Sequence, residues 1–125
     1  MAYWVVGIDR HGINMYNSYV TDGYWQLNLD GLKDARIPNR FALMRVDDRI
    51  ALKSNMGRTR GGIKIQAIGI VTAIDRERRN ISVNWIVTDM ERVLDTRGCL
   101  ARLHGPYEDM VGDTVDPWVH YAFTI

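Results

Sequence analysis

The sequence has a single cysteine, Cys99, and no long apolar run. One cysteine cannot form a disulfide within the chain, and it excludes zinc sites that need several cysteines. A lone thiol is usually a small packed side chain, so we expect Cys99 to lie in the core rather than act as a nucleophile. A membrane-spanning helix needs about 18 or more consecutive apolar residues. The sequence has no such window, and we expect no membrane partner.

The first nine residues, MAYWVVGID, place an acid directly after a short apolar run and contain no basic residue. Secretory signal peptides begin with a basic segment. We therefore expect a cytoplasmic protein.

Catalytic motifs are also scarce. Residues 57–64 resemble a phosphate-binding P-loop only faintly, because Ile63 follows Gly62 where that motif has its lysine. His104 and His120 show no metal-ligand spacing. Adjacent carboxylates such as Asp47 and Asp48 fall at expected turns, where side chains diverge into water. We expect no catalytic residue, no metal and no cofactor.

The residues that are present favour one domain spanning positions 1–125. The chain is 46% hydrophobic and 25% charged, which suffices to bury a core. Short β-branched and aromatic runs between turn residues predict strands. The expected strands cover residues 3–8, 24–27, 49–54, 66–74, 81–87 and 119–124, and the expected helical segments cover 18–23, 38–44 and 90–94. This pattern predicts an α+β fold, a small mixed β-barrel of about six strands with short helices packed outside.

The net charge is +1, but the charges are unevenly distributed. Residues 49–64 contain five cations and no acid, whereas the residues after Arg102 contain four acids and neither lysine nor arginine. The Gly-rich loop between two expected core strands carries Arg58, Arg60 and Lys64, and we expect these side chains to bind phosphate. The alternative is a solvated loop without a ligand.

Two segments carry a resemblance to a known family. They are residues 44–55, MRVDDRIALKSN, and residues 65–69, IQAIG. With Gly23-Tyr24-Trp25 before them and Val83-Asn84-Trp85 after them, they resemble the PUA-like group that includes EVE and YTH domains. Residues 3–87 are most similar to the EVE-like domains at the N-terminus of McrB-type, AAA+ GTP-driven restriction subunits.

The resemblance implies a pocket for a modified nucleobase. A tryptophan in a Gly-x-Trp segment stacks on a flipped, methylated base in YTH domains, and Trp25 stands at the matching position. Two departures change the site: residues 8–10 replace the Ser-Asn-Asn of YTH proteins, and residues 74–80 lack the second cage tryptophan. A second wall would come from Tyr24, Met56, Trp118 or Tyr121. The implied base-pocket residues are Trp25, Tyr24, Asp9, Arg10, Asn14, Lys53, Ser54, Asn55 and Met56.

The expected function is that of a binding module, not an enzyme, which recognises a modified, methylated base in DNA by flipping it into an aromatic pocket. The resemblance implies the specificity domain of a McrB-like restriction system, with an AAA+ GTPase motor in the same or a partner chain and a nuclease subunit. Two alternatives stay open. One is a barrel that binds a free nucleoside, another small molecule or a protein, and the other is an RNA-binding module of the same fold. Steep weakening of binding by salt would separate nucleic acid from a small-molecule ligand.

Overall fold

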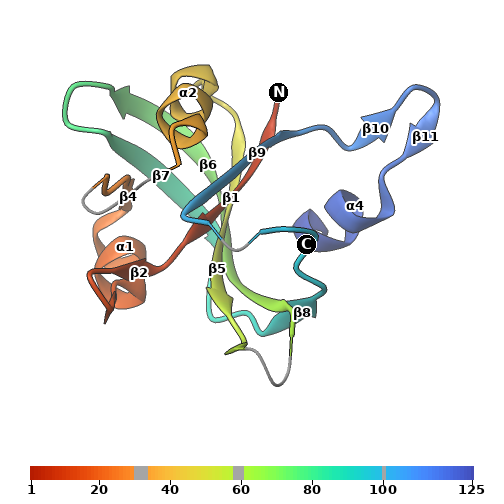
Figure 1. Cartoon of the computed structure of the whole chain (residues 1–125), viewed down its shortest axis with the longest axis horizontal. Helices are drawn as coiled ribbons and strands as arrows, with labels where there is room; N and C mark the ends of the chain where they lie inside the picture. The colour runs from red at the N-terminus through yellow and green to blue at the C-terminus, as the bar shows by residue number, and fades with distance from the viewer. Residues whose placement is uncertain (30–33, 58–60, 100) are drawn as a thin grey trace.

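The computed structural model describes residues 1–29, 34–57, 61–99 and 101–125. Its centre is one mixed sheet, curled into a half-barrel, in which strands follow the order β4-β7-β6-β5-β1-β9 and β8 also pairs with β6 (Figure 1). The strands are β1 (Tyr3–Gly7), β4 (Tyr24–Gln26), β5 (Arg49–Asn55), β6 (Ile63–Asp75), β7 (Asn80–Val87), β8 (Arg92–Leu94) and β9 (Leu103–Tyr107). The expected α+β class, with a curled mixed sheet and short helices, is therefore confirmed.

Strands β1 and β5 are parallel neighbours in the middle of this sheet. Tyr3 pairs with Arg49, and Gly7 pairs with Lys53. The other strand pairs are antiparallel. Because parallel strands finish at the same edge of a sheet, the polar residues that end β5 and follow β1 are brought together.

The turn before β5 holds the first strand in place through Asp48. This carboxylate is 3% exposed and accepts hydrogen bonds from the Ala2 amide at 2.9 Å, the Trp4 indole at 2.9 Å and the Arg45 amide at 2.8 Å. A buried carboxylate is stable in a fold only when donors surround it in this way. Asp48 is therefore a structural part of the motif in residues 44–55.

Strand β6 is 13 residues long and bends where its register against β7 shifts, between Ile68 and Gly69. A Cβ atom at Gly69 would lie 2.6 Å from Val83 Cγ1, 2.7 Å from the Asn84 carbonyl oxygen and 2.9 Å from Trp85 Cε3. Glycine thus allows β7 to approach β6 closely at the bend.

Apolar residues form two cores on the sheet. The first surrounds Trp4, Trp25 and Phe41, and the second surrounds Val5 and Cys99. Cys99 is fully buried, as the sequence predicts.

The helices are α1 (Tyr16–Asp22), α2 (Arg36–Leu43) and α4 (Pro117–Phe123). Within the described ranges, none of the helices has the length and apolar character needed to cross a bilayer.

Two short hairpins extend from the sheet. In the first, β2 (Asp9–Arg10) pairs with β3 (Ile13–Asn14) around a turn of His11 and Gly12, whose φ angles are 52° and 76°. In the second, β10 (Met110–Val111) pairs with β11 (Thr114–Val115) and projects away from the sheet, at the upper right of Figure 1. Both place exposed side chains beside cavities described below.

Two expected elements are wrong. Residues 119–124 belong to helix α4, not to a final strand: the Asp116 side chain accepts hydrogen bonds from the Trp118 and Val119 amides, and Pro117 occupies the first helical turn. Residues 92–94, expected in a helical turn, form β8, in which Leu94 pairs with Ile63 of β6. Strand β9, which was not expected, completes the sheet beside β1.

Candidate functional site

A polar cleft opens at the shared carboxyl end of β1 and β5. Its volume is about 210 Å³. Pockets for drug-sized molecules have volumes of roughly 300–1,000 Å³, so this cleft suits a smaller group, such as one planar ring system. The lining comes from the two strand ends, the β2–β3 hairpin and the chain before β9: Gly7, Ile8, Asp9, His11, Gly12, Lys53, Asn55, Ala101 and Arg102.

Lys53 supplies a buried ammonium group. Its side chain is 3% exposed, and Nζ donates a hydrogen bond to Asn55 Oδ1 at 2.7 Å. None of the ion pairs between described residues includes Lys53. Burial lowers the pKa of Lys53 from 10.5 to about 8, against the opposing influence of Cys99 and Asp9. The group is therefore charged at neutral pH, and two of its three N–H donors make no hydrogen bond to a described residue.

Asn55 and Asp9 complement this donor. The Asn55 Oδ1 atom accepts from Lys53, and the amide N–H donors of this lining residue make no hydrogen bond to a described residue. Asp9 is exposed at the start of β2 and presents a carboxylate acceptor. An ammonium, an amide donor and a carboxylate together match the edge of a planar heterocycle that carries both acceptors and donors.

Cations behind the cleft create a positive potential. His104, in β9, has its pKa lowered from 6.5 to about 4, first by burial and then by Arg40, Lys53 and Arg36. The neutral ring accepts a hydrogen bond from the Ala101 amide at 3.0 Å, so His104 positions the chain that lines the cleft. Arg40 donates to the Leu103 carbonyl at 3.1 Å, and Arg102 donates to the Asn28 carbonyl. These positive groups favour an anionic ligand.

The structure places Trp25 in the core, not in the cleft. Its side chain is 1% exposed, and its indole N–H donates to the Gly7 carbonyl at 3.0 Å. The ring therefore supports the end of β1 from below and offers no face to a ligand. Tyr24, on the same edge strand, makes an edge-to-face contact with Tyr19 at 5.0 Å and does not line the cleft.

The other expected walls of an aromatic pocket also lie elsewhere. Trp118 and Tyr121 are on α4, where Trp118 contacts Tyr107 at a centroid distance of 5.5 Å. Arg92 lies over the Tyr121 ring at 5.5 Å. None of the described lining residues of the cleft is phenylalanine, tyrosine or tryptophan.

The remaining predicted residues divide between structural roles and positions away from the cleft. Arg10 donates to Gln26 Oε1 at 3.0 Å, and Asn14 Oδ1 accepts from the Tyr16 amide at the start of α1. Ser54 pairs with Lys64 across β5 and β6, and neither lines the cleft. Met56 follows β5 and also lies outside the lining. Arg58 and Arg60 lie outside the described residues.

Of the nine predicted pocket residues, Asp9, Lys53 and Asn55 meet in the cleft. His11, Gly12, Ala101 and Arg102 were not predicted. The His11-Gly12 turn is visible in the sequence as a punctuation signal. Arg102 gives no such signal, because it reaches the cleft through a long-range contact in which the Gly7 amide donates to the Arg102 carbonyl at 2.9 Å.

The residues that the structure describes include no group of three or more His, Cys, Asp or Glu side chains placed to hold a metal ion. No family model matches the chain, and no curated protein matches it. The chemistry of the cleft is therefore the main basis for a functional proposal.

Proposed function

We propose that this protein binds nucleic acid and accepts one extruded base in the cleft at the end of β1 and β5. The observation that carries the proposal is the meeting of Asp9, Lys53 and Asn55 in one polar cleft of about 210 Å³. Lys53 and Asn55 come from β5 and Asp9 comes from β2, and their side chains would read the edge of the base.

The energies are compatible with extrusion. Removing a base from the stack costs a few kcal/mol. A hydrogen bond to a charged group such as the Lys53 ammonium or the Asp9 carboxylate contributes about 1.5–3 kcal/mol. In place of a tryptophan, the His11 ring, whose Nε2 atom is hydrogen-bonded with Asn28 Nδ2 at 2.9 Å, would stack on the base, since histidine serves this role in other proteins. Together these contacts offset the cost of extrusion.

Cations near the cleft support binding of the flanking phosphates. Arg102 lines the cleft, and Arg40 contributes to the positive potential at His104. Such contacts add affinity without reading sequence. Phosphate binding by Lys64, Arg58 and Arg60 stays a prediction of the sequence.

The finer part of the proposal concerns the base and the biological system. The resemblance of residues 3–87 to EVE and YTH domains favours a methylated or otherwise modified base in DNA, and burial of one methyl group in the cleft would add about 0.8 kcal/mol of preference. The same resemblance favours a specificity domain that acts beside an AAA+ GTPase motor and a nuclease subunit.

A second candidate function is favoured by the small volume of the cleft and its non-aromatic lining. The same ammonium, amide and carboxylate groups would bind a free nucleoside or another small polar ring. Such a ligand would make no contact with flanking phosphates, so its binding would depend little on salt.

Fluorescence anisotropy tests the proposal directly. Duplex DNA with an unmodified base, methyladenine, methylcytosine or hydroxymethylcytosine is titrated with wild-type protein, and single-stranded DNA and RNA serve as competitors. We expect a preference for one modified duplex that is lost in Lys53→Met and Asp9→Asn. Trp25→Phe should retain the preference, because Trp25 is a core residue.

Lys64→Met is the matched control for Lys53→Met. It removes one lysine outside the cleft, so it should weaken all duplexes equally and leave the preference unchanged. Binding that is unaffected by Lys53→Met and Asp9→Asn would contradict the proposal. Binding of free nucleosides, without binding of any oligonucleotide, would instead support the second function.

A further inference from the structure

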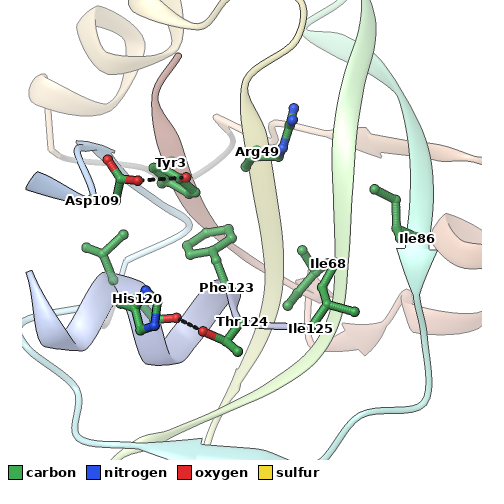
Figure 2. Close-up of a pocket in the computed structure, with 10 residues that line it drawn as sticks. Tyr3, Arg49, Ile68, Ile86, Asp109, His120, Phe123, Thr124 and Ile125 are labelled. Carbon is green, nitrogen blue, oxygen red and sulfur yellow. Dashed lines mark hydrogen bonds between the residues drawn. The ribbon is translucent and has the colours of Figure 1, made fainter. Parts of the chain in front are cut away.

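A second cavity, independent of the cleft, lies where β1 and β5 begin. It is a groove of about 220 Å³ between the end of α4 and the sheet. Figure 2 shows Tyr3 and Arg49 on one side of this groove and Ile68, Ile86, Phe123 and Ile125 around the rest. Ile86 is 47% exposed and Ile125 is 74% exposed. The groove therefore presents aliphatic surface to water, as docking surfaces do.

The β10–β11 hairpin begins at the edge of this groove. Residues 108–115 are all exposed, including Met110 at 39%, Val111 at 67% and Val115 at 47%. Met110 pairs with Val115 and Val111 pairs with Thr114, so aliphatic side chains lie on both faces of the hairpin. A two-stranded hairpin is marginally stable in water by itself. This one gains support at its base, where the Asp116 amide donates to the Asp109 carbonyl at 2.7 Å.

The charges of the hairpin define the kind of partner. Residues 108–115 include Glu108, Asp109 and Asp113 and no cation. Within the part of the chain that the structure describes, Glu108 and Asp113 make no ion pair. Phosphate would be repelled by these acids, whereas aliphatic side chains favour burial against apolar surface. The hairpin thus fits a protein surface that combines an apolar floor with a cation.

The groove of this same chain has that combination. Ile68, Ile86 and Phe123 provide the apolar surface, and Arg49 provides the cation. The Arg49 guanidinium donates to the Asp47 carbonyl at 2.7 Å but forms no ion pair with a described carboxylate. Asp109 connects the two surfaces, because it lines the groove and also forms the base of the hairpin, where it accepts from the Tyr3 hydroxyl at 3.4 Å (Figure 2).

We infer that two copies of this chain form a symmetric dimer in which the β10–β11 hairpin of each copy docks in the groove of the other. A single two-fold axis fills both grooves at once, since each copy carries one groove and one hairpin. The aliphatic side chains of the hairpin then cover Ile86 and Phe123, and its acids approach Arg49. This inference does not depend on the ligand of the cleft.

Sedimentation velocity over a wide range of protein concentrations tests the dimer. Wild-type protein should sediment as a dimer, and Val111→Asp should raise the dissociation constant by about 100-fold, because each substitution acts at two equivalent contacts. Ile13→Asp is the matched control, because Ile13 is 62% exposed and belongs to the β2–β3 hairpin, whose strands also have two residues each. This control should dimerise like wild type.

Charge reversal and cross-linking identify the contact itself. Arg49→Glu should weaken the dimer, and adding Glu108→Arg with Asp113→Arg should restore it. Val111→Cys combined with Ile86→Cys should form a disulfide between copies. A wild-type protein that is monomeric at every concentration, or a dimer that Val111→Asp leaves intact or Ile13→Asp disrupts equally, would overturn the inference. Near-ultraviolet circular dichroism confirms that each variant is folded.

Discussion

Lys53 is a buried ammonium group that makes one neutral hydrogen bond to the described residues, and such a group destabilises the fold that contains it. The neighbouring strands would pack as well around an apolar side chain of the same length. The lowered pKa of Lys53 has the same cause as this destabilisation, namely burial. Strained or costly groups of this kind are common where a protein binds its ligand.

Lys53→Met should therefore stabilise the protein while it abolishes ligand preference. The wild-type penalty is fully present below the folded-state pKa of about 8 and disappears as pH approaches the ordinary value of 10.5. We expect the free energy of unfolding of Lys53→Met to exceed that of wild type by up to about 3 kcal/mol at neutral pH, and by much less near pH 10. Urea denaturation at both pH values measures the difference. An equal or lower stability at neutral pH would mean that Lys53 has a compensating partner.

The bend in β6 shows how an element depends on one glycine. Gly69→Ala should lower the free energy of unfolding by about 2 kcal/mol or more, because its Cβ would lie 2.7 Å from the Asn84 carbonyl oxygen, which cannot move without β7. Gly7→Ala is the matched control, since a Cβ there meets its nearest atom at 3.8 Å. Thermal denaturation of both variants checks the prediction. An equal loss of stability in the two variants would show that β7 moves to accommodate the Cβ atom at little cost in free energy.

Helix α4 depends on its cap in a similar way. Asp116 is 8% exposed, accepts from two α4 amides and forms an ion pair with Arg97 at 2.8 Å. Burial alone would raise the pKa of Asp116, but the bonds from Arg97 and the α4 amides lower it below its ordinary value of 3.8.

Asp116→Ala should cost about 2 kcal/mol of stability at neutral pH. Because the folded-state pKa is lowered, the stabilisation is present above the unfolded value of 3.8 and is lost as pH falls through the lower folded value. The difference between variant and wild type should therefore shrink in acid, as urea denaturation would show. Asp113→Ala, on the exposed hairpin, should leave stability unchanged.

Elements whose sequence pattern reflects local contacts were predictable, and those set by distant contacts were not. The buried strands β1, β5, β6 and β7 follow apolar runs and lie where expected. Apolar and polar side chains alternate in residues 119–124, which predicts a strand. Asp116-Pro117, just before them, is a helix start signal, and the structure follows this signal. Strand β9 contains Gly105-Pro106, which argues against a strand in the sequence, and it forms because β1 lies beside it.

The same distinction applies to the candidate site. Asp9, Lys53 and Asn55 were predicted from the resemblance to YTH domains, and they meet because β1 and β5 end at the same edge of the sheet. The core position of Trp25 was not predictable, because a Gly-x-Trp segment at the mouth of a loop has the same sequence whether its ring faces a ligand or the core. Only the strand register, in which Trp25 pairs with Ile81, turns its ring inward.

At the scale of the molecule, the two surfaces lie at opposite ends of the β1–β5 pair. The cleft lies where Gly7 and Lys53 meet, and the groove lies where Tyr3 and Arg49 meet. A dimer formed through the grooves would leave both clefts accessible. Nucleic-acid binding and dimerisation are therefore separable by substitution.

The small net charge and the few cations near the cleft predict that nucleic-acid binding depends moderately on salt concentration. The net charge is only +1, so long-range attraction should be weak and local phosphate contacts should dominate. With two or three phosphates held near the cleft, the logarithm of the association constant should fall against the logarithm of salt concentration with a slope of about −2 to −3. Anisotropy titrations at several salt concentrations measure this slope. A slope near zero would favour the free small-molecule ligand.

The position of β1 between β5 and β9 also affects how the chain is made. Val6 pairs with Leu52 on one side and with Leu103 on the other, so the first strand gains its second neighbour only when the region of Leu103 has left the ribosome. During most of synthesis one edge of β1 is unpaired, and an exposed apolar edge strand is prone to aggregate. Expression at lower temperature, which weakens hydrophobic association, should therefore increase the soluble yield.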